Sequence, residues 1–232
     1  MKKFFAKAQG SVFIFEGDEL AHFNVLRCKM GEQILCYGED GYNYLCEVTE
    51  IAKKQAVARV IEKTENTKNP KLNITMFQAL VKGEKLDLIV QKLTELGVKE
   101  LYTFSSEFAI AKANDNKLDR LNKISKEACK QCGRSIPLIL HESIAFNKMI
   151  ELLSNYDIIL FANEKNTDRT LSFIKDKKNI AIIVGSEGGF SDGEISAIET
   201  AGATSFGLGD RILRAETACI ALASIVGYIA GV

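Results

Sequence analysis

The sequence predicts an α/β protein in two parts: a small β-rich domain over residues 1–70 and a larger domain over residues 71–232 that is built on a mostly parallel sheet. Two observations lead to this division. Short strand-like runs separated by tight turns fill the first part, whereas strand-like and helix-like runs alternate from residue 72 onward. With 232 residues, 47% of them hydrophobic, the chain is long enough for both parts to bury a core.

The first part has the pattern of a small barrel. Strands are predicted at residues 11–15, 32–37, 42–48 and 56–61, and Asp40-Gly41 between the second and third predicts a hairpin corner. Short strands joined by tight turns are typical of small barrels. The polar stretch Lys63–Lys71, which contains Pro70, is predicted to be a linker.

In the second part the apolar positions alternate between strand and helix periods. The segment Lys85–Gly97 places its apolar residues on one helical face and ends at a glycine. Strands are predicted at residues 72–77, 101–104, 157–161, 180–184 and 204–208, and helices at residues 85–97, 117–132, 169–175, 192–201 and 215–229. This alternation implies a mostly parallel sheet that is covered by helices on both faces.

The charge balance is neutral, since 30 basic residues face 30 acidic ones. A surface for nucleic acid would therefore have to come from local clustering of basic residues. Several basic side chains, Arg120, Lys123, Lys130 and Arg134, share one stripe of the predicted helix 117–132 and its exit, and Lys82 and Lys85 follow the first strand of the larger domain. Such runs are usually solvated faces, and they gain meaning only if they converge on a cleft.

The cysteines predict reduced thiols in the cytoplasm rather than disulfides or a metal site. No export signal is recognised at the N-terminus, and six cysteines without one are typical of a cytoplasmic chain. Cys129 and Cys132 form a C-x-x-C pair inside a helical pattern, without a second pair and with only two histidines in the chain. No metal is predicted.

The uncharged segment Thr217–Val232 raises the question of a membrane. It is shorter than the roughly 20 apolar residues that a spanning helix needs, and it is rich in small residues. A helix that is buried in the core or at a subunit contact is the prediction, and no membrane association is expected.

A glycine-bearing turn after the strand 180–184 is the sharpest local feature. Gly185, Gly188 and Gly189 allow backbone N–H groups to approach a ligand closely, and Ser191 with Glu194 predicts a capping box at the start of the next helix. Ligands of α/β proteins usually bind at such carboxyl ends of parallel strands. A plain tight connection explains the local pattern equally well. The glycine spacing fits neither a dinucleotide loop nor a P-loop.

A second turn, Leu208–Ala218, concentrates charge ahead of the terminal helix. Arg211 and Arg214 can bind phosphate or carboxylate groups bidentately, and Glu216 suits the first turn of a helix. Ordinary capping and surface pairing is the alternative.

Six blocks of the sequence, in order, resemble the bacterial ribosomal RNA small-subunit methyltransferase E family, the 16S rRNA uracil N(3)-methyltransferases of the SPOUT superfamily. The blocks are His22–Arg27 with Gly31, Gln78–Gly83, Gln91–Val98, Glu127–Arg134 with Pro137, Gly185–Gly189 and Leu208–Ala218. They are similar to that family's H-x-x-V-L-R, Q-A-x-x-K-G, Q-K-x-T-E-L-G-V, E-A-x-x-Q-x-x-R, G-P-E-G-G and L-G-x-R-I-L-R-x-E-T-A motifs.

The resemblance implies a fold that the residue pattern alone does not reveal. It implies a PUA-like β-barrel RNA-binding domain at residues 1–70 and a SPOUT α/β trefoil-knot methyltransferase domain at residues 71–232, which forms a homodimer. It also implies S-adenosylmethionine as cofactor, no metal, and 16S rRNA of the small ribosomal subunit as substrate, methylated on ring nitrogen 3 of a uridine.

The resemblance also implies roles for individual residues. Arg214 is the candidate catalytic residue, with Glu216 as a candidate proton acceptor. The candidate cofactor-binding residues are Leu160, Val184, Gly185, Glu187, Gly188, Gly189, Leu208, Gly209, Ile212, Leu213, Thr217 and Ala218. The candidate RNA-binding residues are His22, Arg27, Lys82, Lys92, Arg134 and Arg211.

Two departures from the family pattern affect these expectations. Ser186 stands where the family usually has proline, so the glycine-bearing turn is expected to be less rigid. Lys130 and Cys132 replace the more usual acid and serine. Cofactor binding is expected to survive, since backbone groups supply most of the expected contacts.

Two other functions remain compatible with the sequence. One is a non-catalytic RNA-binding or ribosome-assembly protein that retains the knotted domain without affinity for S-adenosylmethionine. The other is the same kind of enzyme acting on a different RNA.

Overall fold

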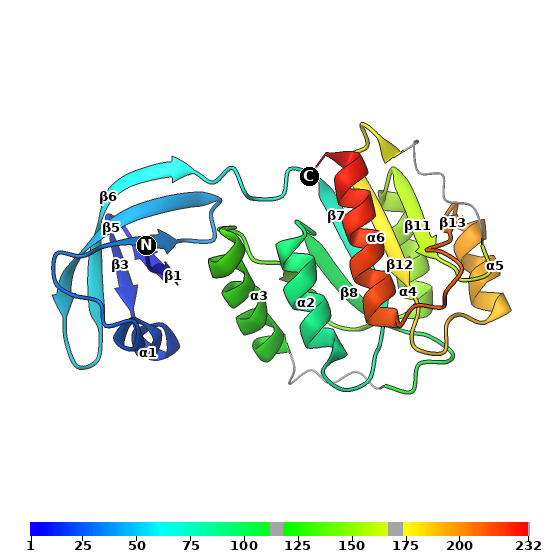
Figure 1. Ribbon diagram of the computed structural model, residues 1–232, viewed down its shortest axis with the longest axis horizontal. Coiled ribbons are helices and arrows are strands. Elements are labelled where there is room, and N and C mark those ends of the chain that lie inside the picture. Colours follow the sequence, from blue (N-terminus) through cyan, green and yellow to red (C-terminus); the bar gives the residue numbers. More distant parts are fainter. Residues whose placement is uncertain (112–117, 167–173, 232) are drawn as a thin grey trace. The chain divides into compact units, whose positions relative to one another are not determined.

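The computed structural model describes residues 1–111, 118–166 and 174–231 (Figure 1). It divides into two compact units. The N-terminal unit comprises residues 1–69 together with 129–137, and the C-terminal unit comprises residues 70–128 and 138–232.

The N-terminal unit is a curled six-stranded sheet in the order β1-β4-β5-β6-β3-β2, with one helix. The elements are β1 (Lys3–Phe5), β2 (Lys7–Gln9), β3 (Val12–Phe15), α1 (Gly17–Val25), β4 (Gln33–Tyr37), β5 (Tyr42–Ile51) and β6 (Ala56–Glu65). The four predicted strands and the hairpin corner are confirmed. Aromatic side chains fill the core, among them Phe4, Phe13, Phe15 and Phe23.

Three elements of this unit were not predicted. β1 and β2 have three residues each, too few for a period-2 pattern to appear. Helix α1 buries only Leu20 and Phe23, one pair at i, i+3. The predicted linker is wrong at its start, because β6 continues to Glu65. There the Lys63 ammonium lies 3.9 Å from the Tyr42 ring centroid, so these polar residues are held in the hairpin.

Residues 129–137 belong to the N-terminal unit through hydrogen bonds to two asparagines. The Asn66 side chain donates to the Gly133 carbonyl at 2.9 Å, and the side-chain oxygen Oδ1 of Asn69 accepts from the Ser135 N–H at 2.9 Å. Arg134 lies in the same segment and is buried. Only 2% of it is exposed, and its Nε donates to the Ile136 carbonyl at 3.1 Å.

The C-terminal unit is a seven-stranded sheet whose strand pairs are all parallel among the strands that the structure describes. The order is β10-β8-β7-β12-β11-β13, and β9 pairs with β8. The strands are β7 (Asn73–Ala79), β8 (Glu100–Ser105), β9 (Ile139–Leu140), β10 (Ile144–Ala145), β11 (Ile158–Ala162), β12 (Asn179–Val184) and β13 (Thr204–Phe206). The helices are α2 (Lys85–Glu95), α3 (Leu118–Cys132, whose last residues belong to the N-terminal unit), α4 (Phe146–Leu152), α5 (Asp192–Thr200) and α6 (Ala215–Ala230).

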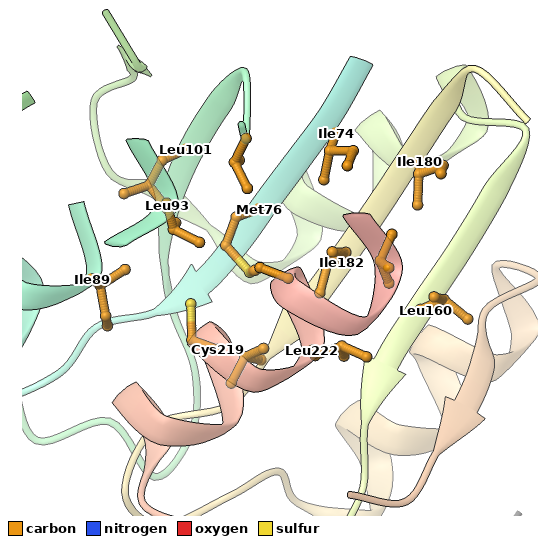
Figure 2. Close-up of a cluster of buried hydrophobic side chains, with 14 of the residues drawn as sticks. Ile74, Met76, Ile89, Leu93, Leu101, Leu160, Ile180, Ile182, Cys219 and Leu222 are labelled. Carbon is orange, nitrogen blue, oxygen red and sulfur yellow. The ribbon is translucent and has the colours of Figure 1, made fainter. Parts of the chain in front are cut away.

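Both faces of this sheet are covered, as predicted. Ile74 and Met76 point to one face, where they meet apolar side chains of α2 and α6, whereas Phe77 and Ala79 point to the other, toward α4 and α5. Figure 2 shows the first face, with Cys219 and Leu222 of α6 lying over the strands. Burial on both faces explains why β12 is almost entirely apolar.

The remaining predictions have different outcomes. The short elements β9, β10 and α4 were missed. The predicted helix 169–175 lies largely outside the described residues. The trefoil knot stays a prediction of the family resemblance. In the described part of the chain, no helix is long and apolar enough to cross a membrane, and the uncharged C-terminal segment forms α6.

Candidate cofactor site

A pocket of about 560 Å³ lies where β11, β12 and β13 end in the C-terminal unit. Its size falls in the range of small-molecule sites. It is lined by the turns after these three strands and by the starts of α2 and α6: Lys85, Ala162, Asn163, Glu164, Val184, Gly185, Ser186, Glu187, Gly188, Gly189, Phe190, Leu208, Gly209, Arg211, Ile212, Leu213, Arg214, Ala215 and Ala218.

The turn after β12 is so tight that glycine is required at several positions. A Cβ on Gly188 would lie 2.7 Å from the Cβ of Phe108, and a Cβ on Gly185 would lie 3.2 Å from the Phe190 ring. Gly189 has φ +71°, a conformation that side-chain-bearing residues rarely adopt. The pocket wall is therefore bare backbone, which can approach a ligand closely.

Ser186, which stands where proline was expected, is held by hydrogen bonds. Its hydroxyl accepts from the Gly188 N–H at 3.3 Å, and its carbonyl accepts from the Gly189 N–H at 3.1 Å. Only 6% of the residue is exposed. These two bonds restrain the turn at the position where proline was expected, and the expectation of a less rigid turn stays a prediction.

Two buried polar side chains that lie outside this turn, Gln78 and Glu194, hold it and its neighbours in place by hydrogen bonds. Gln78, at 0% exposure, donates from Nε2 to the Gly185 carbonyl at 2.9 Å. Beyond the turn, Ser191 and Glu194 form the predicted capping box of α5. The second oxygen of Glu194 accepts from the Glu107 N–H at 2.8 Å, so the segment around Phe108 is tied to the same helix start.

The Glu187 carboxylate contacts two lysine residues. Its carboxylate lies 2.5 Å from the Lys85 ammonium and accepts from the Lys82 N–H at 3.1 Å. Burial alone would raise the pKa of Glu187, but the ammonium and the backbone amide outweigh it and hold the pKa below its ordinary value. Lys85 also lies 3.8 Å from Glu216.

The arginine-rich turn lines the same pocket. Gly209 has φ +120°, and Arg214 is the N-cap residue of α6. Arg211 and Arg214 are both exposed and both line the pocket. Their guanidinium groups and the N-terminus of α6 favour negative charge on a bound molecule.

The structure brings most of the predicted site residues together. Of the candidate cofactor residues, Val184, Gly185, Glu187, Gly188, Gly189, Leu208, Gly209, Ile212, Leu213 and Ala218 line the pocket. Leu160 and Thr217 do not. The Leu160 side chain is buried in the core beneath α6, and Thr217 is exposed on that helix. Arg214 lines the pocket, whereas Glu216 lies behind it, next to Lys85.

The candidate RNA residues are dispersed. Arg211 lines the pocket, and the exposed Lys82 lies beside Glu187. Lys92 forms an ion pair with Glu95 at 2.9 Å, one helical turn away. In the N-terminal unit Arg27 is exposed and His22 packs edge-on against Phe4. Arg134 is buried and its Nε donates to the Ile136 carbonyl, so its role in RNA binding stays a prediction.

Sequence reasoning missed Lys85, Ser186 and Phe190 as lining residues and overlooked the segment Ala162–Glu164. A usable signal existed for that segment, since it follows β11, and the carboxyl ends of neighbouring parallel strands share one edge of the sheet. No local sequence pattern indicates that Phe190 lines the pocket. It reaches the pocket while packing against Phe104 and Phe161 in the core.

The C-x-x-C pair lies at the end of α3. Cys129 is buried, Cys132 is partly buried, and neither is joined in a disulfide in the described part of the chain. Within residues 1–111, 118–166 and 174–231, no group of three or more His, Cys, Asp or Glu side chains is arranged to hold a metal ion.

Comparison with known families agrees with this arrangement. A family model for the RNA methyltransferase domain matches residues 67–227, and one for the RNA methyltransferase PUA domain matches residues 15–61. The ribosomal RNA small subunit methyltransferase E of Mesomycoplasma hyopneumoniae is 30% identical, covering 96% of this chain and 97% of its own. The enzyme of that name from Buchnera aphidicola is 33% identical, covering 90% and 85%.

Solved structures match both units together. The ribosomal RNA small subunit methyltransferase E of Neisseria gonorrhoeae, bound to S-adenosyl methionine, superposes with a TM-score of 0.90 at 27% identity over 99% of this chain and 98% of its own. A methyltransferase of Legionella pneumophila in complex with the same cofactor gives a TM-score of 0.89 at 26% identity over 97% and 96%. By sequence, by fold and by the two domain models, this chain belongs to the ribosomal RNA small subunit methyltransferase E family of RNA methyltransferases.

Proposed function

We propose that this protein transfers the methyl group of S-adenosylmethionine to ring nitrogen 3 of a uridine in 16S rRNA of the small ribosomal subunit. The single observation that carries the proposal is the pocket where the glycine-bearing turn and the arginine-rich turn meet. Family membership supplies the substrate class, and the pocket supplies a place for the chemistry.

The pocket fits the cofactor in size and in chemistry. Backbone of the Gly185–Gly189 turn lies bare, because a Cβ on Gly188 would collide with Phe108. Apolar side chains of Val184, Leu213 and Ala218 line the same space. We expect these groups to hold the adenosine and methionine parts by backbone hydrogen bonds and apolar contacts. When bound, S-adenosylmethionine supplies an electrophilic methyl group on sulfur.

Arg214 is the candidate catalytic residue. Loss of the proton from nitrogen 3 leaves negative charge on the uracil oxygens, and the exposed Arg214 guanidinium stands at the pocket to receive it. The target base must be unpaired or turned outward, because nitrogen 3 lies on its base-pairing edge. Glu216 does not line the pocket, so a direct role as proton acceptor is less well supported than a role that acts through Lys85.

Replacing Arg214 by alanine is predicted to lower kcat for methylation of small subunits by about a hundredfold, because the charge-stabilising donor is lost. S-adenosylhomocysteine should bind with unchanged affinity, since backbone groups hold it. Steady-state kinetics and calorimetry on one preparation measure both quantities. Unchanged methylation by this variant would remove Arg214 from the reacting side.

Calorimetric titration with S-adenosylhomocysteine separates the proposal from its main rival. The enzyme should bind this product with one site per chain. A non-catalytic RNA-binding or ribosome-assembly protein should show RNA binding that weakens with salt and no heat with S-adenosylhomocysteine.

Three further parts of the proposal concern the whole protein. We assign residues 1–70 to RNA binding through exposed groups such as Arg27, and residues 71–232 to methyl transfer. We also assign a homodimer, which the 87% exposure of Tyr228 on the mostly apolar α6 favours. Action on ribosomal subunits places the protein in the cytoplasm. Light scattering across a concentration series tests the dimer.

A further inference from the structure

Lys85 connects three segments that are distant in sequence. It is the first residue of α2, and its ammonium lies 2.5 Å from Glu187 in the glycine-bearing turn and 3.8 Å from Glu216 in the first turn of α6. Its side chain is 27% exposed and lines the pocket. One cation thus lies near two carboxylates, one in the glycine-bearing turn and one in the first turn of α6.

The environment of Glu216 makes this cation necessary. The Glu216 side chain is 12% exposed, and its Oε2 is buried without a hydrogen-bond partner among the residues that the structure describes. A buried carboxylate is unfavourable unless a nearby charge compensates it. The ion-pair contact seen for Glu216 in these segments is the one with Lys85.

Other charged groups near the pocket do not replace Lys85. Arg211, Arg214 and Glu164 line the same space, and the Lys82 N–H reaches Glu187 at 3.1 Å. Neither arginine forms an ion pair with Glu187 or Glu216 in the described segments. An ordinary surface ion pair contributes little to stability. Lys85 differs because it lies near a buried carboxylate oxygen and contacts two separate segments, the glycine-bearing turn and the start of α6.

We propose that Lys85 is a positioning residue: by sharing its charge between Glu187 and Glu216, it fixes the glycine-bearing turn against the first turn of α6. Glu216 is two residues from Arg214, so the same contact sets the distance between the bare backbone that receives the cofactor and the guanidinium that faces the base. The consequence for catalysis rests on the proposed function, whereas the order of the turn does not.

Hydrogen–deuterium exchange of the amides of residues 185–190 in ligand-free protein tests the positioning directly. The variants are Lys85→Met, Lys85→Arg, and Lys85→Met combined with Glu216→Gln. Lys148→Met is the matched control, because Lys148 also pairs with a glutamate, Glu151 at 2.8 Å, but on an exposed helix surface. Thermal unfolding establishes that each variant is folded, and calorimetry measures affinity for S-adenosylhomocysteine.

The expected result is graded. Lys85→Met should speed exchange in this turn and weaken S-adenosylhomocysteine binding, each by about tenfold, a factor that corresponds to about 1.4 kcal/mol. Lys85→Arg should keep most of both properties. The double variant should recover much of the loss, since a neutral amide at position 216 tolerates burial without a cation.

The double variant also distinguishes charge compensation from simple packing. If Lys85 acted only by packing, adding Glu216→Gln to Lys85→Met would leave the loss unchanged, because the carboxylate charge would not be the cause.

Two outcomes would overturn the proposal: Lys85→Met behaving like Lys148→Met, or no recovery in the double variant. Failure of the proposed function looks different. In that case wild-type protein would not bind S-adenosylhomocysteine, while the exchange of the turn would still respond to Lys85.

Discussion

At the scale of single residues, glycines decide the shape of the pocket wall. Gly188 packs against Phe108 so closely that a methyl group in its place would lie 2.7 Å from the Phe108 Cβ, closer than real side chains approach. Gly193, five residues on, has only the Ser191 hydroxyl at 3.9 Å near the same position. The two glycines therefore differ in what an added methyl group would displace.

Gly188→Ala is predicted to weaken S-adenosylhomocysteine binding by about tenfold, because overpacking shifts the turn that forms the wall. Gly193→Ala should bind like wild type. Calorimetry on both variants makes the comparison, and equal affinities would show that the turn accommodates the methyl group without changing the pocket.

Glu187 predicts a pH dependence whose sign follows from its environment. Although burial opposes ionisation, the Lys85 ammonium and the Lys82 N–H keep the pKa of Glu187 below 4.5, its ordinary value. A depressed carboxyl pKa stabilises the fold above the unfolded value and loses that contribution as pH falls through the folded one. The difference in thermal midpoint between wild type and Glu187→Gln should thus be present at pH 7 and shrink as the pH falls below 4.5 and through the lowered folded pKa of Glu187. A difference that is constant with pH would contradict this.

Local residue patterns predicted the two turns that line the pocket, but they did not predict all of the residues that lie next to these turns. Gly185–Gly189 and Leu208–Ala218 were identified because glycines and charges that directly follow a strand pattern are typical of ligand-binding turns. Lys85 stood out only as one of two basic residues that follow the first strand of the larger domain, since nothing local shows that a helix start will meet two carboxylates. Arg134 was expected on RNA and is buried, because burial of a basic residue depends on tertiary partners such as the Ile136 carbonyl.

At the scale of elements, the sheet and its helices position the site. β12 is buried on both faces and ends at Val184, where the glycine-bearing turn begins. The turn is fixed at its far end by the capping box of α5, in which the Ser191 hydroxyl accepts from the Glu194 N–H at 3.3 Å.

Ser191→Ala is predicted to lower the free energy of unfolding by about 1 kcal/mol, as loss of an N-cap usually does. Ser196→Ala, on the exposed side of the same helix, should change it little. Denaturant unfolding of the two variants measures the difference. Equal stability would indicate that the capping box adds nothing measurable here.

Long elements were predictable and short ones were not. The apolar pattern of α2 or β12 extends over enough residues to show its period, whereas β1, β2, β9 and β10 have two or three residues each. Their pairing is decided by neighbouring strands, which a local pattern does not contain.

At the scale of the whole molecule, two units divide the work in the proposed function. A curled sheet with exposed Arg27 is assigned to RNA binding, and a parallel sheet whose strand ends form the pocket is assigned to methyl transfer. The neutral overall charge suits this division, since binding of RNA then depends on where basic residues gather.

The most direct test of this account is to map methyluridine in 16S rRNA after purified protein and S-adenosylmethionine are added to small subunits from cells that lack this protein. One new methyl group is expected, on ring nitrogen 3 of one uridine, and none with Arg214→Ala in the same time. Methylation of another RNA or another ring atom, or none by wild-type protein that binds S-adenosylhomocysteine, would contradict it.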